Sequence, residues 1–144
     1  MKVIDGLIND TIGFTCSCFD LLHAGHIIML QYAKARCDRL IVGLQTAPTI
    51  DRPDTKNKPI QSLEERKIQL KAVKYVDEIF EYTTEEELYK KLLFINPDVR
   101  ILGSDYIGKS FTGDDLDIKI YYHDRNHNYS TTNLRKKIVS EHIH

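Results

Sequence analysis

The chain has 144 residues, of which 42% are hydrophobic and 28% are charged, an ordinary composition for one globular domain. Its 20 basic and 21 acidic residues give a formal net charge of −1, so no field of the whole molecule attracts nucleic acid or an anionic membrane. Three cysteines without a framework spacing argue against a disulfide scaffold, and no apolar run reaches the roughly 20 residues of a membrane span. These properties predict a cytoplasmic domain that binds neither nucleic acid nor membrane.

The predicted elements begin with a strand, a helix and a second strand. Residues 11–16 are rich in β-forming side chains and predict a short buried strand, and residues 25–37 follow as a mainly apolar helix. Residues 39–44 form a continuous apolar run, as expected for a central parallel strand covered on both faces. Three such elements in about 30 residues match the size of a βαβ unit. The preceding residues 1–10 could form an extra edge strand or a loose arm.

The alternation continues after a long loop with several prolines at residues 45–61. Ser62 and Glu65 have the spacing of a capping box and predict the start of a helix, and Thr84 and Glu87 repeat this spacing. Apolar stretches predict further strands at residues 75–80, 99–102 and 118–122.

A closing helix completes the predicted chain. Ser130 or Thr131 would cap this helix, which would turn Leu134 and Ile138 inward. Because strands and helices alternate, we predict an α/β fold, a Rossmann-like doubly wound sheet of about five parallel strands with helices on both faces. No shift of composition marks a boundary, so residues 1–144 are predicted to form a single domain, with residues 1–10 as an N-terminal extension.

Two histidines, His23 and His26, stand where the first strand gives way to its helix. In an open α/β sheet this junction faces the ligand crevice, and the helix N-terminus offers unpaired N–H groups to a phosphate. Gly25 between them would allow a close approach of the backbone. The pattern predicts a phosphate site, but two unrelated histidines or a metal site also fit it. Three residues could complete such a metal site: Asp20, His123 or His127.

Four short motifs occur in order along the chain. They are Asp-Leu-Leu-His-Ala-Gly-His at residues 20–26, Lys-Tyr-Val-Asp-Glu at 74–78, Leu-Gly-Ser-Asp-Tyr at 102–106, and Arg125 followed by Ser-Thr-Thr at 130–132. Together they resemble the signature motifs of the cytidylyltransferase-like nucleotidyltransferases, and most of all those of the glycerol-3-phosphate cytidylyltransferases. The resemblance covers nearly the whole chain, and four motifs in the right order are far more specific than the histidine motif by itself.

The resemblance implies transfer of a cytidylyl group from CTP to a small phosphomonoester, glycerol 3-phosphate in the first instance, with release of pyrophosphate. The second pKa of a phosphate is about 6, so the attacking oxygen is already ionised at neutral pH and requires no general base. The site must therefore supply alignment and positive charge for the transition state. The resemblance also implies Mg²⁺ bridging the triphosphate, no metal ligand set in the protein itself, and a homodimer.

Individual residues receive roles from the same resemblance. His23 and His26 would hold the α- and β-phosphates, while Arg125 and the helix start at Ser130 and Thr131 would hold the β- and γ-phosphates. With Lys56 and Lys58 from the proline-containing loop, these histidines and Arg125 form the expected catalytic set. The nucleotide would further contact Cys16, Ser17, Cys18, Phe19, Asp20, Gly25, Gly103, Asp105, Tyr106 and Tyr129. The acceptor would contact Lys56, Lys58, Lys74 and Asp77.

The sequence departs from the family pattern at several positions. Ser17 stands where the family usually has a glycine, and Cys18 replaces a hydroxyl with a poorer hydrogen-bond donor. Lys74 replaces an arginine and loses its planar fork. These changes leave the acceptor open, so an adenylyltransferase, or a cytidylyltransferase for another phosphorylated metabolite, is the main alternative. A non-catalytic nucleotide-binding or metal-binding domain of the same fold is the alternative from a different class.

Overall fold

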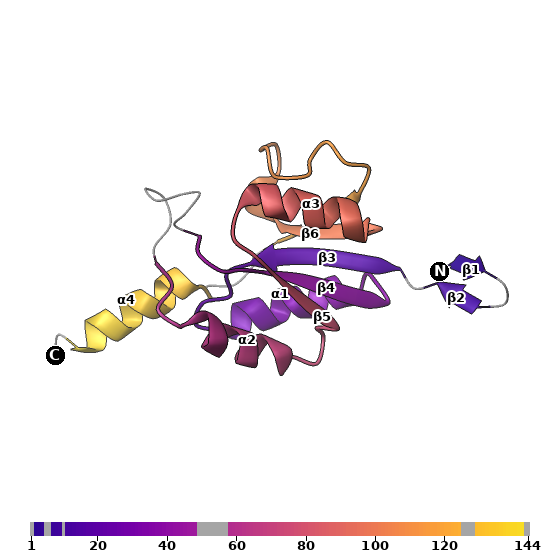
Figure 1. Cartoon of the computed structure of the whole chain (residues 1–144). Coiled ribbons are helices and arrows are strands. Elements are labelled where there is room, and N and C mark those ends of the chain that lie inside the picture. The colour runs from indigo at the N-terminus through magenta and orange to yellow at the C-terminus, as the bar shows by residue number, and fades with distance from the viewer. Residues whose placement is uncertain (1, 5–6, 10, 49–57, 125–128, 143–144) are drawn as a thin grey trace.

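A five-stranded parallel sheet forms the centre of the computed structural model, which describes residues 2–4, 7–9, 11–48, 58–124 and 129–142 (Figure 1). Its strands are β3 (Ile12–Ser17), β4 (Arg39–Gln45), β5 (Glu78–Tyr82), β6 (Val99–Gly103) and β7 (Lys119–His123). They lie in the order β5-β4-β3-β6-β7, and every neighbouring pair is parallel. The predicted parallel sheet is confirmed.

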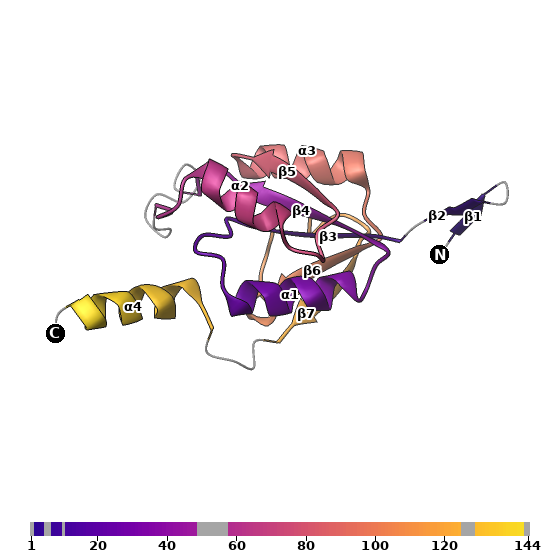
Figure 2. The same ribbon diagram turned by 90° about the horizontal axis from the view of Figure 1, so that it is seen from below.

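The helices cover both faces of this sheet, as a doubly wound fold requires. They are α1 (Ala24–Lys34), α2 (Leu63–Lys71), α3 (Glu85–Ile95) and α4 (Thr131–His142), with a short 3₁₀ turn, η1 (Ser104–Tyr106). Helices α1 and α2 lie on one face and α3 on the other, while α4 extends away beyond the carboxyl ends of the strands (Figures 1 and 2). In the part of the chain that is described, no helix is both long and apolar enough to cross a membrane.

Two hydrophobic clusters pack on the two faces of the sheet. The cluster under α1 and α2 includes Leu30, Leu40, Val42, Leu44, Leu70 and Ile101. The cluster under α3 consists of Phe14, Tyr82, Leu88 and Leu92. Because residues from both clusters cover it, β4 is buried from Leu40 to its end, which explains its unbroken apolar sequence.

Local capping explains where two helices begin. The Oγ of Ser62 accepts a hydrogen bond from the Glu65 amide at 3.1 Å, and the Glu65 carboxylate accepts one from the Ser62 amide at 3.1 Å, which confirms the predicted capping box. Thr84 caps α3 by accepting from the Glu87 amide at 3.2 Å, whereas the Glu87 carboxylate bonds the Thr83 amide instead. The second predicted box is therefore only half formed.

Other sequence-based expectations differ from the structure. The strand expected at residues 75–80 begins only at Glu78, because the residues before it form a turn. Strands β1 (Lys2–Ile4) and β2 (Leu7–Asn9) pair with each other and add no edge to the main sheet. The expectation that Ile138 faces inward is wrong, since its side chain is 56% exposed on the projecting helix α4.

The strand order creates a crevice at one end of the sheet. The chain winds from β3 through β4 to β5 in one direction, and then returns to β6 and β7 on the other side of β3. Ligands of open α/β sheets bind outside the carboxyl ends of the strands at such a reversal, here between β3 and β6. The loops after these two strands are therefore where a site is expected.

Neighbouring leucines of α3 offer a test of this packing. Leu92 is 1% exposed and Leu93 is 55% exposed, so only the first loses buried contacts when shortened. We expect Leu92→Ala to lower the free energy of unfolding by about 2–5 kcal/mol and Leu93→Ala to change it by less than about 0.5 kcal/mol. Urea denaturation of the two variants measures this difference, and equal losses would contradict the assignment of the inner face of α3.

Candidate active site

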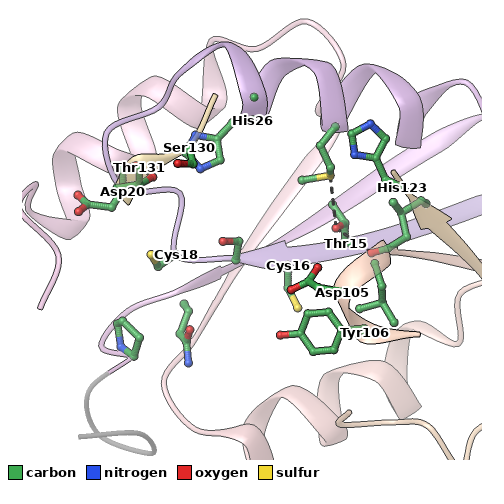
Figure 3. A pocket seen from close by; sticks show the side chains of 18 of the residues that line it. Thr15, Cys16, Cys18, Asp20, His26, Asp105, Tyr106, His123, Ser130 and Thr131 are labelled. Atoms are coloured by element: carbon green, nitrogen blue, oxygen red, sulfur yellow. Dashed lines mark hydrogen bonds between the residues drawn. The ribbon is translucent and has the colours of Figure 1, made fainter. Parts of the chain in front are cut away.

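A cavity of about 460 Å³ lies at the predicted reversal, where β3 and β6 end (Figure 3). Its walls come from the ends of β3, β5 and β6, the first turns of α1, α3 and α4, and the segment after β6. Figure 3 shows His26, Ser130 and Thr131 on one side of β3, and Cys16 with Asp105 on the other. The cavity therefore has two sides with different side chains.

The two histidines of the first motif cap α1. The Nδ1 atom of His23 accepts a hydrogen bond from the Gly25 amide at 3.0 Å, and Nδ1 of His26 accepts one from the His23 amide at 3.1 Å. Their rings stack with centroids 3.9 Å apart. Since both Nδ1 atoms accept, each neutral ring carries its proton on Nε2 and can donate from that atom.

Thr131 connects the first turns of α1 and α4. The Nε2 atom of His23 lies 3.2 Å from the Thr131 hydroxyl, and that hydroxyl lies 3.1 Å from the backbone carbonyl of Asp20, to which it donates. Ser130 caps α4 by accepting from the Asn133 amide at 3.0 Å. Two helix N-termini, each a positive dipole end, thus meet on the same side of the cavity.

Gly25 has a steric reason to be a glycine. A Cβ atom at this position would lie 2.8 Å from the carbonyl oxygen of Tyr129 and 2.9 Å from Cε1 of His23. The missing side chain therefore allows the segment before α4 to pass directly over the start of α1. This close approach joins the two helix starts, which the sequence alone did not indicate.

A buried carboxylate, that of Asp20, holds three segments together beside these helices. It is 3% exposed and accepts hydrogen bonds from the amides of Ile60 and Gln61 at 2.9 Å each, and from Arg135 at 2.7 Å. Burial by itself would raise the pKa of Asp20, but these hydrogen bonds and the Arg135 charge outweigh it and lower the pKa. Asp20 is therefore ionised in the folded protein and engaged by α4.

Arg66 supports the same region and was missed by the sequence analysis. It is 2% exposed and donates to the carbonyls of Cys18 at 2.9 Å, Gln45 at 2.7 Å and Thr46 at 2.8 Å. It thus ties the ends of β3 and β4 together under the cavity. In the sequence it belongs to a charged run, Glu-Glu-Arg-Lys, and nothing there distinguishes it from a solvated side chain.

The loop between β3 and α1 is strained at positions other than the one expected. Phe19 and Leu21 have φ values of 49° and 50°, in the left-handed region that costs non-glycine residues about 1 kcal/mol or more. Ser17 lies in regular strand β3, so its difference from the family glycine involves no such backbone strain. The turn places the Phe19 ring in the core, 5.4 Å from the His26 ring, and so Phe19 does not line the cavity.

Most of the predicted nucleotide contacts do line the cavity. These are Cys16, Ser17, Cys18, Asp20, Gly25, Gly103, Asp105, Tyr106, Tyr129, Ser130 and Thr131, together with His23 and His26. Buried His123, at the end of β7, also lines it and packs on the Tyr32 ring with centroids 4.8 Å apart. Within the described ranges, no three side chains gather as a metal site, and His127 of the metal hypothesis lies outside them.

Two of the predicted acceptor contacts, Asp77 and Lys74, do not line the cavity. Asp77 accepts from the Leu40 amide at 2.8 Å and from Lys34 at 2.6 Å, at the amino end of β4. Lys74 lies over the Tyr75 ring in the same turn. The assignment of Asp77 and Lys74 is corrected, because residues that precede a parallel strand lie at the end of the sheet opposite the crevice.

Of the three remaining residues predicted for catalysis, the structure describes only Lys58. Lys58 is exposed and does not line the cavity, although its carbonyl accepts from Arg135 at 3.4 Å. Lys56 and Arg125 lie outside the described residues.

This combination of fold and crevice defines a Rossmann-like α/β domain with a ligand cavity at the carboxyl ends of its strands. A family model described as cytidylyltransferase-like matches residues 14–137, and the chain belongs to the cytidylyltransferase-like nucleotidyltransferase family. The resemblance found in the sequence motifs is thereby confirmed at the level of the family.

Curated relatives include several bifunctional proteins named HldE. The chain is 38% identical to HldE of Caulobacter vibrioides over 135 residues, which cover 90% of this chain and 27% of that protein. It is 34% identical to HldE of Helicobacter pylori, with coverage of 95% of this chain and 30% of that protein. The chain thus spans less than a third of the length of these relatives.

Solved structures give the same fold. A lipopolysaccharide core biosynthesis protein from Thermoplasma volcanium matches with a TM-score of 0.65 and 26% identity, over 85% of this chain and all (100%) of that chain. A pantothenate synthetase from Thermus thermophilus matches with a TM-score of 0.62 and 15% identity, over 91% of this chain and 66% of that chain. At that identity the second match supports the fold alone.

The buried ion pair of Asp20 predicts a pH-dependent loss of stability. Because the folded-state pKa is below the ordinary value of 3.8, the carboxylate stabilises the fold above that value, and this contribution disappears as the pH falls through the folded-state pKa. We expect Asp20→Asn to lower the free energy of unfolding by about 1–3 kcal/mol at neutral pH.

Denaturant melts of wild type and Asp20→Asn over a pH series measure this effect. The difference between the two proteins should be constant from neutral pH to about pH 5 and shrink as the pH falls below that. A difference that stays the same down to strong acid would show that the Asp20 charge does not stabilise the fold.

Proposed function

We propose that this domain transfers a nucleotidyl group from a nucleoside triphosphate to a phosphorylated sugar and releases pyrophosphate. The observation that carries the proposal is the meeting of two helix N-termini with His23, His26 and Thr131 on one side of the cavity. Backbone N–H groups, hydroxyls and imidazole donors in that arrangement suit a triphosphate. Membership of a nucleotidyltransferase family supports the same reaction.

The proposed reaction forms one bond and breaks another at the α-phosphorus. An oxygen of the acceptor phosphate attacks, the bond to the β-phosphate oxygen breaks, and pyrophosphate leaves with the electron pair. His26 donates from Nε2 to a phosphate oxygen, whose negative charge it stabilises in the transition state. His23 gives its Nε2 proton to the Thr131 hydroxyl and so holds the two helix starts in position around the phosphates. The helix starts hold the triphosphate in line, so alignment and charge supply the catalysis.

Mg²⁺ in this proposal enters with the nucleotide. Asp20 is the acid nearest the histidines in the sequence, but its oxygens already accept from two amides and from Arg135. The described residues therefore fit a cation that is held mainly by the phosphates of the substrate, where it would neutralise charge.

The similarities favour a different substrate pair from the one first expected. The curated relatives are named HldE and not as cytidylyltransferases, so we propose ATP, the donor of the adenylyltransferase alternative, in place of CTP. The match to a lipopolysaccharide core biosynthesis protein suggests a sugar phosphate as acceptor in place of glycerol 3-phosphate. CTP and glycerol 3-phosphate remain the comparison that an experiment must include.

Pyrophosphate release in the presence of Mg²⁺ tests the proposal. ATP and CTP are each paired with mannose 1-phosphate, a manno-heptose 1-phosphate and glycerol 3-phosphate. We expect release with ATP and an aldose phosphate, and a loss of about 10²–10³ in rate for His26→Ala because one transition-state donor is removed. Lys74→Ala is the matched control and should retain the wild-type rate, since Lys74 lies at the other end of the sheet.

Binding of non-hydrolysable ATP and CTP analogues, measured by calorimetry, provides a second readout. Analogue binding without pyrophosphate release from any pair would favour the non-catalytic nucleotide-binding alternative. An unchanged rate in His26→Ala would remove the histidine from the proposed mechanism.

A further inference from the structure

The side of the cavity that faces α3 contains a group of polar side chains that the proposed phosphate chemistry does not use. We call this part the α3-side chamber, defined by Cys16, Tyr82, Glu85, Arg100, Phe111 and Thr112. Cys16 lies on the opposite side of β3 from His26 (Figure 3). The chamber therefore belongs to the same cavity as His23 and His26, but its side chains lie apart from the groups proposed to bind phosphate.

Arg100 is the unusual member of the chamber. It is 3% exposed, and among the described residues no carboxylate lies within ion-pair distance of it. Its guanidinium donates to the Thr112 carbonyl and, at 3.9 Å, to the Cys16 sulfur. Its Nε atom is buried without a hydrogen-bond partner in that part of the chain. A buried donor left unpaired in this way is costly, and a ligand that brings an acceptor oxygen would relieve the cost.

The neighbours of Arg100 do not neutralise it directly. Burial raises the pKa of the Cys16 thiol, which therefore stays uncharged beside the guanidinium. Thr112 links Glu85 to Arg100: its hydroxyl donates to the Glu85 carboxylate at 3.0 Å, and its carbonyl accepts from the Arg100 guanidinium. The chamber thus presents a cationic donor and an anionic acceptor, and the Tyr82 hydroxyl, which hydrogen-bonds the Cys16 thiol, lines it as well.

Such a wall suits a molecule with many hydroxyl groups better than a second phosphate. Each hydroxyl of a sugar donates one hydrogen bond and accepts others, so it can use Arg100 as donor and the Glu85 carboxylate or the Tyr82 hydroxyl oxygen as acceptor. A further anion has no hydrogen to donate, so it could use Arg100 but neither of these acceptors. The Phe111 ring, 5.1 Å from the Arg100 guanidinium carbon, adds the apolar surface typical of small-molecule sites.

We propose that the α3-side chamber binds the polyhydroxylated carbon skeleton of the acceptor, with Arg100 and Tyr82 as its specificity-determining residues. This inference rests on the proposed function, which places the acceptor phosphate next to the α-phosphate of the nucleotide and leaves the rest of the acceptor to be accommodated. It also replaces Lys74 and Asp77, which the structure locates elsewhere, as the acceptor contacts.

Calorimetric titration of the protein saturated with a non-hydrolysable ATP analogue tests the chamber. The probes are mannose 1-phosphate, a manno-heptose 1-phosphate and inorganic phosphate. We expect both aldose phosphates to bind more tightly than inorganic phosphate, and Tyr82→Phe to weaken them by about tenfold, the equivalent of one hydrogen bond. Affinity for the analogue and for inorganic phosphate should stay the same.

Tyr89→Phe is the matched control, since the Tyr89 hydroxyl bonds Asp115 at 2.8 Å outside the chamber. It should bind all probes like the wild type. Aldose phosphates that bind no better than inorganic phosphate, or a Tyr82→Phe variant with unchanged affinity for them, would overturn the proposal.

Arg100→Met separates a binding role from a purely structural one. We expect this variant to lose aldose-phosphate binding while its melting temperature stays at or above that of the wild type, because a buried cation without an ion pair is removed. A lower melting temperature with unchanged affinity would assign Arg100 to the fold alone.

The chamber and the reaction can fail independently. Aldose-phosphate binding that depends on Tyr82, without pyrophosphate release, would support the chamber and contradict the proposed reaction. Pyrophosphate release that is unchanged by Tyr82→Phe would support the proposed reaction and contradict the chamber.

Discussion

The reversal of winding between β3 and β6 is the constraint on which the rest of this structure depends. Right-handed crossovers carry the chain from β3 to β5 on one side and to β7 on the other, so the loops after β3 and β6 diverge to opposite faces. The resulting crevice cannot be filled by either crossover. The residues that line the cavity come from the carboxyl-terminal parts of the strands, from the loops that follow them and from the helices that begin beside them.

Polar groups at the crevice serve the fold and the site together. His23 and His26 satisfy amides at the start of α1 through Nδ1, which fixes the tautomer and turns Nε2 into the donor. The carboxylate of Asp20 pairs with Arg135 and so attaches the otherwise projecting helix α4 to the body. A substitution at these positions therefore alters stability and site geometry at once, and the two effects must be measured separately.

The two sides of the cavity divide the proposed chemistry. One side has helix N-termini and imidazoles, which suit phosphates, and the other combines Arg100, Glu85 and Tyr82, which suit hydroxyls. The strand β3 separates them, and a phosphorylated sugar spanning its end would contact both sides. In the proposed reaction, this division gives the nucleotide phosphates and the acceptor skeleton separate surfaces of one cavity.

The sequence by itself determined the order of elements, the parallel sheet, the capping of α2 and the place of His23 and His26, because these follow from local periodicity and from motifs contiguous in the chain. Only the tertiary structure decided which charged residues are buried. Arg66 and Arg100 look like ordinary surface or strand residues in the sequence, and their burial depends on carbonyls contributed by distant segments. Lys74 and Asp77 resembled site residues by motif, but the direction of β5 places them at the opposite end of the sheet. The end of the sheet at which a residue lies, and whether its side chain is buried, depend on how distant segments assemble, and no local sequence pattern encodes that.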